Sequence, residues 1–341
     1  MPALVLASMV TLVALIAPFA VMLTFLRTRN NLRSTRWARL EAAWNPRIMG
    51  LVSGEATAEE LVPLARRRDR RFILAIAARF ASRLAGKDRD VVEDFARTLI
   101  PTLLRDLGSR RPEVRARAVK TIALLSFDDH VGEVLVALDD DSPLVGMVAA
   151  RALARHGGAT FISDVLSHLH RFAEWNPEFV STMLASVGHG VAPPMRRMLL
   201  DPGQHPLVRR VIADALRLLP DPVAGDGAAW VLSGSEEREL QAACLRLLAV
   251  VGRPDHVWAI EPYLHHPDFA LRAHAVTAFG QTALPRHLPA VESLLDDPSP
   301  WVALRAAEAL AIAGELGMLE ERASLEGPAG TLAREVLELA V

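Results

Sequence analysis

The sequence predicts an all-α protein in which one transmembrane helix precedes an α-solenoid of about seven to eight stacked helical hairpins. Three observations support this fold class. The first 25 residues, MPALVLASMVTLVALIAPFAVMLTF, contain no charged side chain. A turn followed by an alanine-rich helix recurs along the chain, as in DDPSPWVALRAAEALAIAGE. No segment shows the alternating pattern that is typical of a strand.

Residues 1–26 are long enough to cross a hydrocarbon core of roughly 30 Å as a helix. Pro18 is compatible with this reading, since membrane helices tolerate proline. A cleaved signal peptide is the alternative, but it favours a basic start and a shorter apolar run. Here the first charged side chain is Arg27. We therefore expect an uncleaved membrane anchor.

Residues 27–54 are predicted to form a basic juxtamembrane segment. Arginine accumulates on the cytoplasmic side of membrane helices, and tryptophan favours the interface. The N-terminus is thus expected outside and the rest in the cytoplasm. Arginines vastly outnumber the two lysines, which suggests a GC-rich bacterial genome and hence a bacterial inner membrane. The arginines either only set this topology or also bind lipid headgroups. Candidate headgroup contacts are Arg27, Arg29, Arg33, Arg36, Arg39, Trp37 and Trp44.

The repeat occupies residues 105–315. Each alanine-rich helix opens with an aliphatic residue, and small or aliphatic residues follow at offsets 4, 7 and 8, which share one helical face. Proline at the preceding turn suits the first turn of a helix. A second amphipathic segment lies between successive alanine-rich helices, so each unit is a hairpin that buries its apolar side against the next. The opening residues are Val114, Val145, Val180, Val208, Leu240, Leu271 and Val302.

The two ends of the array are predicted to be caps. Residues 55–104 contain helical patterns that are out of register with the repeat and are expected to form the N-terminal helical cap. Residues 316–341 are expected to form the C-terminal cap, with GTLAREVLELAV as the last helix.

The copy DPSPWVALRAAEALAIAG resembles the short HEAT-type repeat, in particular the form of roughly 30 residues shared with phycobilin lyases. The resemblance covers about residues 105–315 and implies a solenoid. Many copies keep an arginine after the opening residue, as Arg115, Arg209 and Arg272 do, whereas Gly146 and Ala303 replace it. The family includes scaffolds, lyases and hydroxylases, so the resemblance alone implies no single activity.

We find no catalytic, cofactor-binding or metal-binding constellation in the sequence. The His-Glu dipeptides with which the related deoxyhypusine hydroxylases hold iron are absent. The pair His265-His266 with Asp268 could offer metal ligands, but turn histidines are the favoured interpretation. Cys244 occupies a core position of the repeat and is predicted to be a small buried side chain. Carboxylates at turns, as at Asp139–Asp141 and Asp296–Asp297, are expected to cap the following helix.

The charge distribution argues against nucleic-acid binding. Beyond residue 49 the chain has a net charge of −7, whereas binding to nucleic acid usually needs a broad basic surface. The leading hypothesis is a membrane-anchored cytoplasmic scaffold that binds a protein partner at or in the membrane. No small-molecule substrate is expected. The alternative is a lyase-like or metal-dependent enzyme acting in the groove.

The expected partner-binding surface is the concave side of the array. Offset 6 of each register-marked helix should point outward there, and its residues are mixed in charge. Trp301, Trp258 and Trp230 could anchor a partner, although core filling is the favoured role for each of them. The candidate partner-binding residues are Lys120, Arg151, Asp214, Arg246, Thr277, Glu308 and Trp301.

Overall fold

The computed structural model describes residues 22, 35–174, 176–283 and 285–340. The predicted transmembrane helix over residues 1–26, apart from Met22, lies outside the described residues, as do Arg27, Arg29 and Arg33. Among the residues that are described, no helix combines the length and the apolar character that crossing a membrane requires. Every regular element of the described part is helical, which confirms the all-α prediction.

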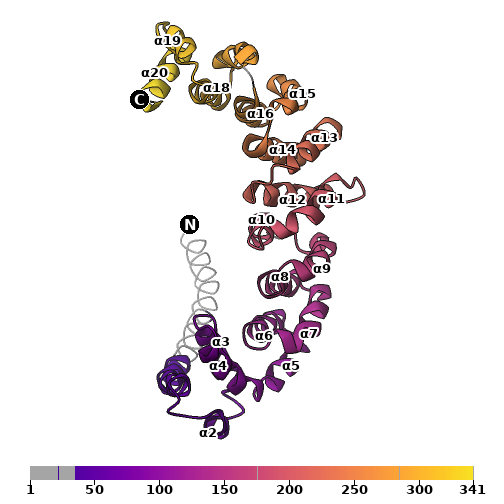
Figure 1. The fold of residues 1–341 in the computed structure, drawn as a ribbon, viewed down its shortest axis with the longest axis vertical. Helices are drawn as coiled ribbons and strands as arrows, with labels where there is room; N and C mark the ends of the chain where they lie inside the picture. Colours follow the sequence, from indigo (N-terminus) through magenta and orange to yellow (C-terminus); the bar gives the residue numbers. More distant parts are fainter. Residues whose placement is uncertain (1–21, 23–34, 175, 284, 341) are drawn as a thin grey trace, which may run out of the picture. The chain divides into compact units, whose positions relative to one another are not determined.

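The chain divides into two compact units, Met1–Val131 and Gly132–Val341. In the first unit a helix over residues 35–53 precedes five labelled α-helices (Figure 1). These are α2 (Ala58–Leu61), α3 (Arg70–Ala81), α4 (Lys87–Arg97), α5 (Pro101–Leu107) and α6 (Pro112–Leu125). The short helix α7 (Val131–Val136) lies at the boundary between the units.

The second unit contains two alternating sets of helices (Figure 1). The first layer carries the predicted register marks and consists of α8 (Pro143–Ala152), α10 (Pro177–Ala185), α12 (Pro206–Leu218), α14 (Arg238–Val251), α16 (Phe269–Thr282) and α18 (Pro300–Ile312). The second layer consists of α9 (Ile162–Ser167), α11 (Ala192–Leu200), α13 (Ala224–Gly234), α15 (Val257–Ile260) and α17 (Leu288–Glu292). Two further helices, α19 (Leu316–Ala323) and α20 (Pro328–Ala340), follow α18.

Neighbouring hairpins pack within each layer. From α10 to α18, each first-layer helix contacts the next one, and α13 contacts both α11 and α15 in the second layer. Helix α20 contacts α18. This is the packing of stacked hairpins that the recurring alanine-rich helices predict.

The predicted register matches the buried core. In α18 the residues at offsets 0, 4, 7 and 8 are Val302, Ala306, Ala309 and Leu310, and all four are buried. Small residues at this face let backbones approach closely. A Cβ atom added to Gly280 of α16 would lie only 2.6 Å from the Cβ of Ala309. Proline begins α6, α8, α12 and α18, as expected for a residue without a backbone N–H.

After four of the register marks the next residue has a structural role that explains the recurring arginine. Its side chain donates a hydrogen bond to a carbonyl of the segment just before its own helix, either in the turn or, for Arg209, in the last turn of α11. Gln241 replaces arginine in α14 and makes the equivalent bond. The donors and carbonyls are Arg115 to Ser109, Arg209 to Leu199, Gln241 to Ser235 and Arg272 to His266. These bonds satisfy carbonyls that the preceding turn leaves unpaired.

Candidate functional site

A hollow on the first layer gathers three of the predicted partner-binding residues. It has a volume of about 420 Å³ and lies where α14, α16 and α18 meet. We name it the Trp301 hollow. Its lining residues are Arg246, Phe269, Ala270, Ala273, His274, Thr277, Trp301 and Arg305. Arg246, Thr277 and Trp301 were predicted from the sequence, whereas Phe269, His274 and Arg305 were not.

The two aromatic side chains of the hollow project from the first turns of their helices. Pro300 begins α18 and is followed directly by Trp301. Phe269 begins α16, where the Asp268 side chain accepts a hydrogen bond from the backbone N–H of Ala270. Trp301 is 64% exposed and Phe269 is 50% exposed. Such exposure of large apolar side chains around a concave surface is typical of interaction sites.

The expectation that the three repeat tryptophans fill the core is wrong. Trp230 and Trp258 are 55% and 57% exposed, similar to Trp301. They belong to α13 and α15 of the second layer, whereas Trp301 belongs to the first.

Ion pairs neutralise the charged rim of the Trp301 hollow. Arg246 binds Asp214 on the neighbouring helix through both carboxylate oxygens, with N–O distances of 3.0 and 3.1 Å. Arg305 binds Glu308 at 2.7 Å. Asp214, Arg246 and Glu308 were all predicted as separate outward-facing charges of offset 6. In the structure Asp214 pairs with Arg246, and Glu308 pairs with Arg305. The charges of these side chains therefore largely cancel, which suits an apolar group.

His274 contributes the unpaired polar group of the hollow. Its ring makes no hydrogen bond to any described residue. Burial, together with the positive charges of Arg246 and Arg305, lowers the pKa of His274 below its ordinary value of 6.5. The imidazole is therefore neutral at pH 7 and offers one N–H donor and one acceptor to a bound partner.

The lowered pKa of His274 predicts a loss of stability in mild acid. Because the unfolded chain binds this proton more tightly, protonation favours unfolding as the pH falls below 6.5. We expect the free energy of unfolding to decline from pH 7 to pH 5, and His274→Gln to reduce that decline. Urea titrations at several pH values measure the free energy of unfolding of both proteins. An unchanged decline in His274→Gln would assign the effect to other groups.

A second hollow, of about 430 Å³, lies between α8 and α10. We name it the Arg151 hollow, after the predicted residue that lines it. Its other lining residues are Ala154, Arg155, Gly158, Phe179, Thr182, Met183, Ser186 and Val187. The guanidinium carbon of Arg151 lies 5.4 Å from the centre of the Phe179 ring, which is a cation–π arrangement. Lys120, the remaining predicted residue, is exposed on α6 of the first unit.

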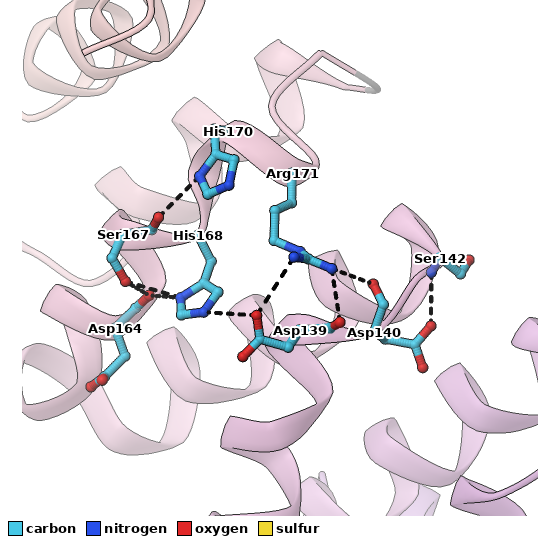
Figure 2. Close-up of polar contacts among 8 residues, drawn as sticks. All are labelled: Asp139, Asp140, Ser142, Asp164, Ser167, His168, His170 and Arg171. Atoms are coloured by element: carbon cyan, nitrogen blue, oxygen red, sulfur yellow. Dashed lines mark hydrogen bonds and ion pairs between the residues drawn. The ribbon is translucent and has the colours of Figure 1, made fainter. Parts of the chain in front are cut away.

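A polar cluster between the turn before α8 and the end of α9 contains an aspartate, a histidine and a serine (Figure 2). His168 Nε2 lies 3.3 Å from Asp139 Oδ1, and its Nδ1 lies 3.0 Å from Ser167 Oγ. However, Ser167 Oγ donates to the carbonyl of Asp164, and Nδ1 lies only 2.7 Å from that same carbonyl. Nδ1 therefore carries a proton and cannot accept one from the serine, so the trio does not form a nucleophile–base pair.

The same cluster connects two hairpins. Arg171 donates hydrogen bonds to the backbone carbonyls of Asp139 and Asp140, at 2.8 and 3.2 Å (Figure 2). Asp140 in turn accepts from the backbone N–H of Ser142, before α8. Asp140 thus closes the turn before α8 but does not cap that helix, whose N-cap residue is Ser142, and Asp139 binds the side chains of His168 and Arg171, so the expected capping role is wrong for both. The cluster is structural.

The remaining candidates for chemistry are used by the fold. Cys244 is fully buried, and burial raises the pKa of its thiol to about 12, so it is unreactive as a nucleophile. His266 Nδ1 accepts a hydrogen bond from the backbone N–H of Asp268, as a turn residue would. Within the described ranges, no group of three or more His, Cys, Asp or Glu side chains could hold a metal ion.

The described lipid candidates contact protein to different extents. Trp44 is only 4% exposed and stacks on Phe95 of α4 at 5.9 Å, so its prediction as a headgroup contact is corrected. Arg36 binds Asp69 at 2.5 Å. Trp37 packs on Phe72 at 5.7 Å, and Arg39 is exposed. Of the described candidates, Arg39 is thus the side chain that remains fully available to a lipid headgroup.

The comparison with protein families matches residues 98–180 and 225–311 to HEAT repeats. The chain contains HEAT repeats. The two matched segments include α6, α8 and much of α13 to α18. No curated protein matches the chain.

Several solved structures are similar to this HEAT-repeat chain. Kap121p is 14% identical with a TM-score of 0.47, and the match covers 82% of this chain. Kap121p bound to Pho4p is also 14% identical, with a TM-score of 0.48 and the same coverage. The chain spans 39% of the length of Kap121p. The complex of CpcE and CpcF of phycocyanin lyase from Nostoc sp. PCC7120 is 19% identical with a TM-score of 0.34, covering 70% of this chain and 86% of that one.

Proposed function

We propose that this protein is a scaffold that binds a protein partner through the first layer of its HEAT repeats. The observation that carries the proposal is the Trp301 hollow, where exposed Trp301 and Phe269 flank an apolar concave surface. Tryptophan in such a setting dominates binding energy at protein interfaces. Neutral His274 adds a hydrogen-bonding group to the lining of the hollow, which orients a bound side chain.

The proposal includes a membrane location for the complex. It is supported by the uncharged stretch over residues 1–26 and by the arginines that follow it. In this arrangement the N-terminus lies outside a bacterial inner membrane and the repeats lie in the cytoplasm. The partner is then a protein at or in that membrane, since the anchor concentrates the repeats at its surface.

Removing both aromatic side chains of the hollow is expected to abolish partner binding. Truncation of central aromatic residues costs about 2 kcal/mol or more each, or roughly thirty-fold in affinity. The full-length chain is purified from its native cells in mild detergent, and co-purifying proteins are quantified for wild type and for the double variant Trp301→Ala/Phe269→Ala.

Trp258→Ala provides the matched control, because Trp258 is similarly exposed but belongs to the second layer. Proteins that are lost from the double variant and kept by Trp258→Ala support the proposal. A set of co-purifying proteins that is the same for all three chains, or the absence of any such protein from the wild type, would refute it.

A further inference from the structure

The arginines of the first layer fall into two groups. Those of α12 to α18 have an acceptor within the protein: Arg209 donates to the carbonyl of Leu199, and the others bind carboxylates, Arg210 that of Glu239, Arg217 and Arg246 that of Asp214, Arg238 that of Asp268, Arg272 that of Asp297 and Arg305 that of Glu308. Arg151 and Arg155, by contrast, have no carboxylate partner among the described residues. Each of the other first-layer arginines has a carboxylate or carbonyl acceptor, so two neighbouring cations without one indicate a surface that is completed by an anionic group from outside.

The backbone places these two arginines around one hollow. Arg151 lies in the last turn of α8, which continues directly into a π-helical segment, η4 (Leu153–Gly157), that contains Arg155. Gly158 then ends this segment with a φ of +55°, a conformation that favours glycine. The π-helical turn is wider than an α-helical one and changes the direction in which Arg155 projects. Both side chains line the Arg151 hollow.

The other groups of the hollow determine what it can bind. Thr182 Oγ1 donates to the carbonyl of Glu178 at 3.0 Å, and Ser186 Oγ donates to the carbonyl of Met183 at 2.6 Å. The arginines are therefore the hydrogen-bond donors left for a ligand. Stacking on Phe179 holds the Arg151 guanidinium in place and leaves its edge N–H groups free for a carboxylate.

The floor of the hollow is apolar. The hollow is lined by Ala154, by Phe179 and Met183 of α10, and by Val187 of the turn that follows α10. A free phosphate ion has no group that would use this surface, whereas a peptide can place an aliphatic side chain beside a carboxylate.

We propose that the Arg151 hollow binds an acidic segment of a protein partner, in which an Asp or Glu carboxylate lies next to an aliphatic side chain. The carboxylate is bound by Arg151 and Arg155, and the aliphatic group packs on Phe179 and Met183. This inference rests on the proposed scaffold function and names the chemistry recognised at a second place on the first layer.

The test uses the full-length chain in nanodiscs of zwitterionic lipid and a short fluorescein-labelled peptide of alternating Glu and Leu. A second peptide has Gln in place of Glu. Fluorescence anisotropy should show that wild type binds the Glu peptide at least about tenfold more tightly than the Gln peptide, because charge-assisted hydrogen bonds are the stronger kind. The preference should decrease as salt is added.

The double variant Arg151→Gln/Arg155→Gln should lose the preference for the Glu peptide. The control variant Arg197→Gln should keep it, since Arg197 is an exposed arginine of α11 in the second layer. Thermal unfolding of both variants should match wild type. Equal binding of the two peptides by wild type, a preference that survives in the double variant, or displacement of the peptide by millimolar inorganic phosphate would each overturn the inference. None of these outcomes bears on the test with Trp301, so the two proposals fail separately.

Discussion

Replacing Arg272 with alanine is expected to lower the free energy of unfolding by about 3–5 kcal/mol, because it leaves a buried carboxylate without its partner. Arg272 of α16 binds Asp297 in the turn before α18 through two bonds of 2.7 and 2.8 Å. The two side chains are only 14% and 5% exposed. Burial raises the pKa of Asp297, but hydrogen bonds from Arg272 and Ser299 outweigh it and hold the pKa below its usual value.

Urea unfolding followed by circular dichroism measures this loss. Arg238→Ala is the matched control, since Arg238 at the start of α14 binds Asp268 across an equivalent repeat boundary but is 54% exposed. An exposed pair contributes at most about 1 kcal/mol. If the two variants unfold at the same urea concentration, the Arg272–Asp297 pair is not the stabilising contact described above.

Phe279→Ala is expected to destabilise the protein by about 3–5 kcal/mol as well, because it leaves a cavity in the core of the second unit. Phe279 is fully buried at offset 8 of α16. The control lies on the same helix: Phe269→Ala removes an identical side chain that is half exposed. It should change the unfolding free energy by less than about 1 kcal/mol while it weakens partner binding.

Thermal and urea unfolding of the two phenylalanine variants therefore separate packing from binding. The expected order is a large loss for Phe279→Ala and a small one for Phe269→Ala. The reverse order would mean that the register of α16 is assigned to the wrong face.

The core was predictable because the same apolar pattern recurs in several copies of the repeat. Offsets 0, 4, 7 and 8 place Val302, Ala306, Ala309 and Leu310 on one face, and a single hydrophobic period is enough to identify them. The pairing of Asp214 with Arg246 was also accessible in principle. Both residues occupy offset 6, one repeat apart, so stacked helices bring them to the same height. A single helix considered alone shows Asp214 and Arg246 only as separate charges, because the pair forms between neighbouring helices.

The Trp301 hollow was only partly predictable. Trp301 stood out as an aromatic residue at a turn, but Phe269 and His274 reach the same surface from another helix, at offsets −2 and 3. These side chains come together with Trp301 only because of the way α16 and α18 stack. The apolar periodicity within one helix does not specify that stacking. The π-helical turn at Leu153–Gly157 also has no clear sequence signal. Trp44 was misplaced because its neighbouring arginines suggested an interface, whereas Phe95 of α4 covers it.

The hydrogen bond that follows four of the register marks bears on how such a chain changes length during evolution. Its donors Arg115, Arg209, Gln241 and Arg272 each bind a carbonyl of the segment just before their own helix, so donor and acceptor are inherited together when that segment and the helix are duplicated or lost as one repeat. A duplicated hairpin brings its own turn contact and two packing faces that match its neighbours. Gene segments that encode one complete hairpin are thus the natural units in which this array gains or loses binding surface.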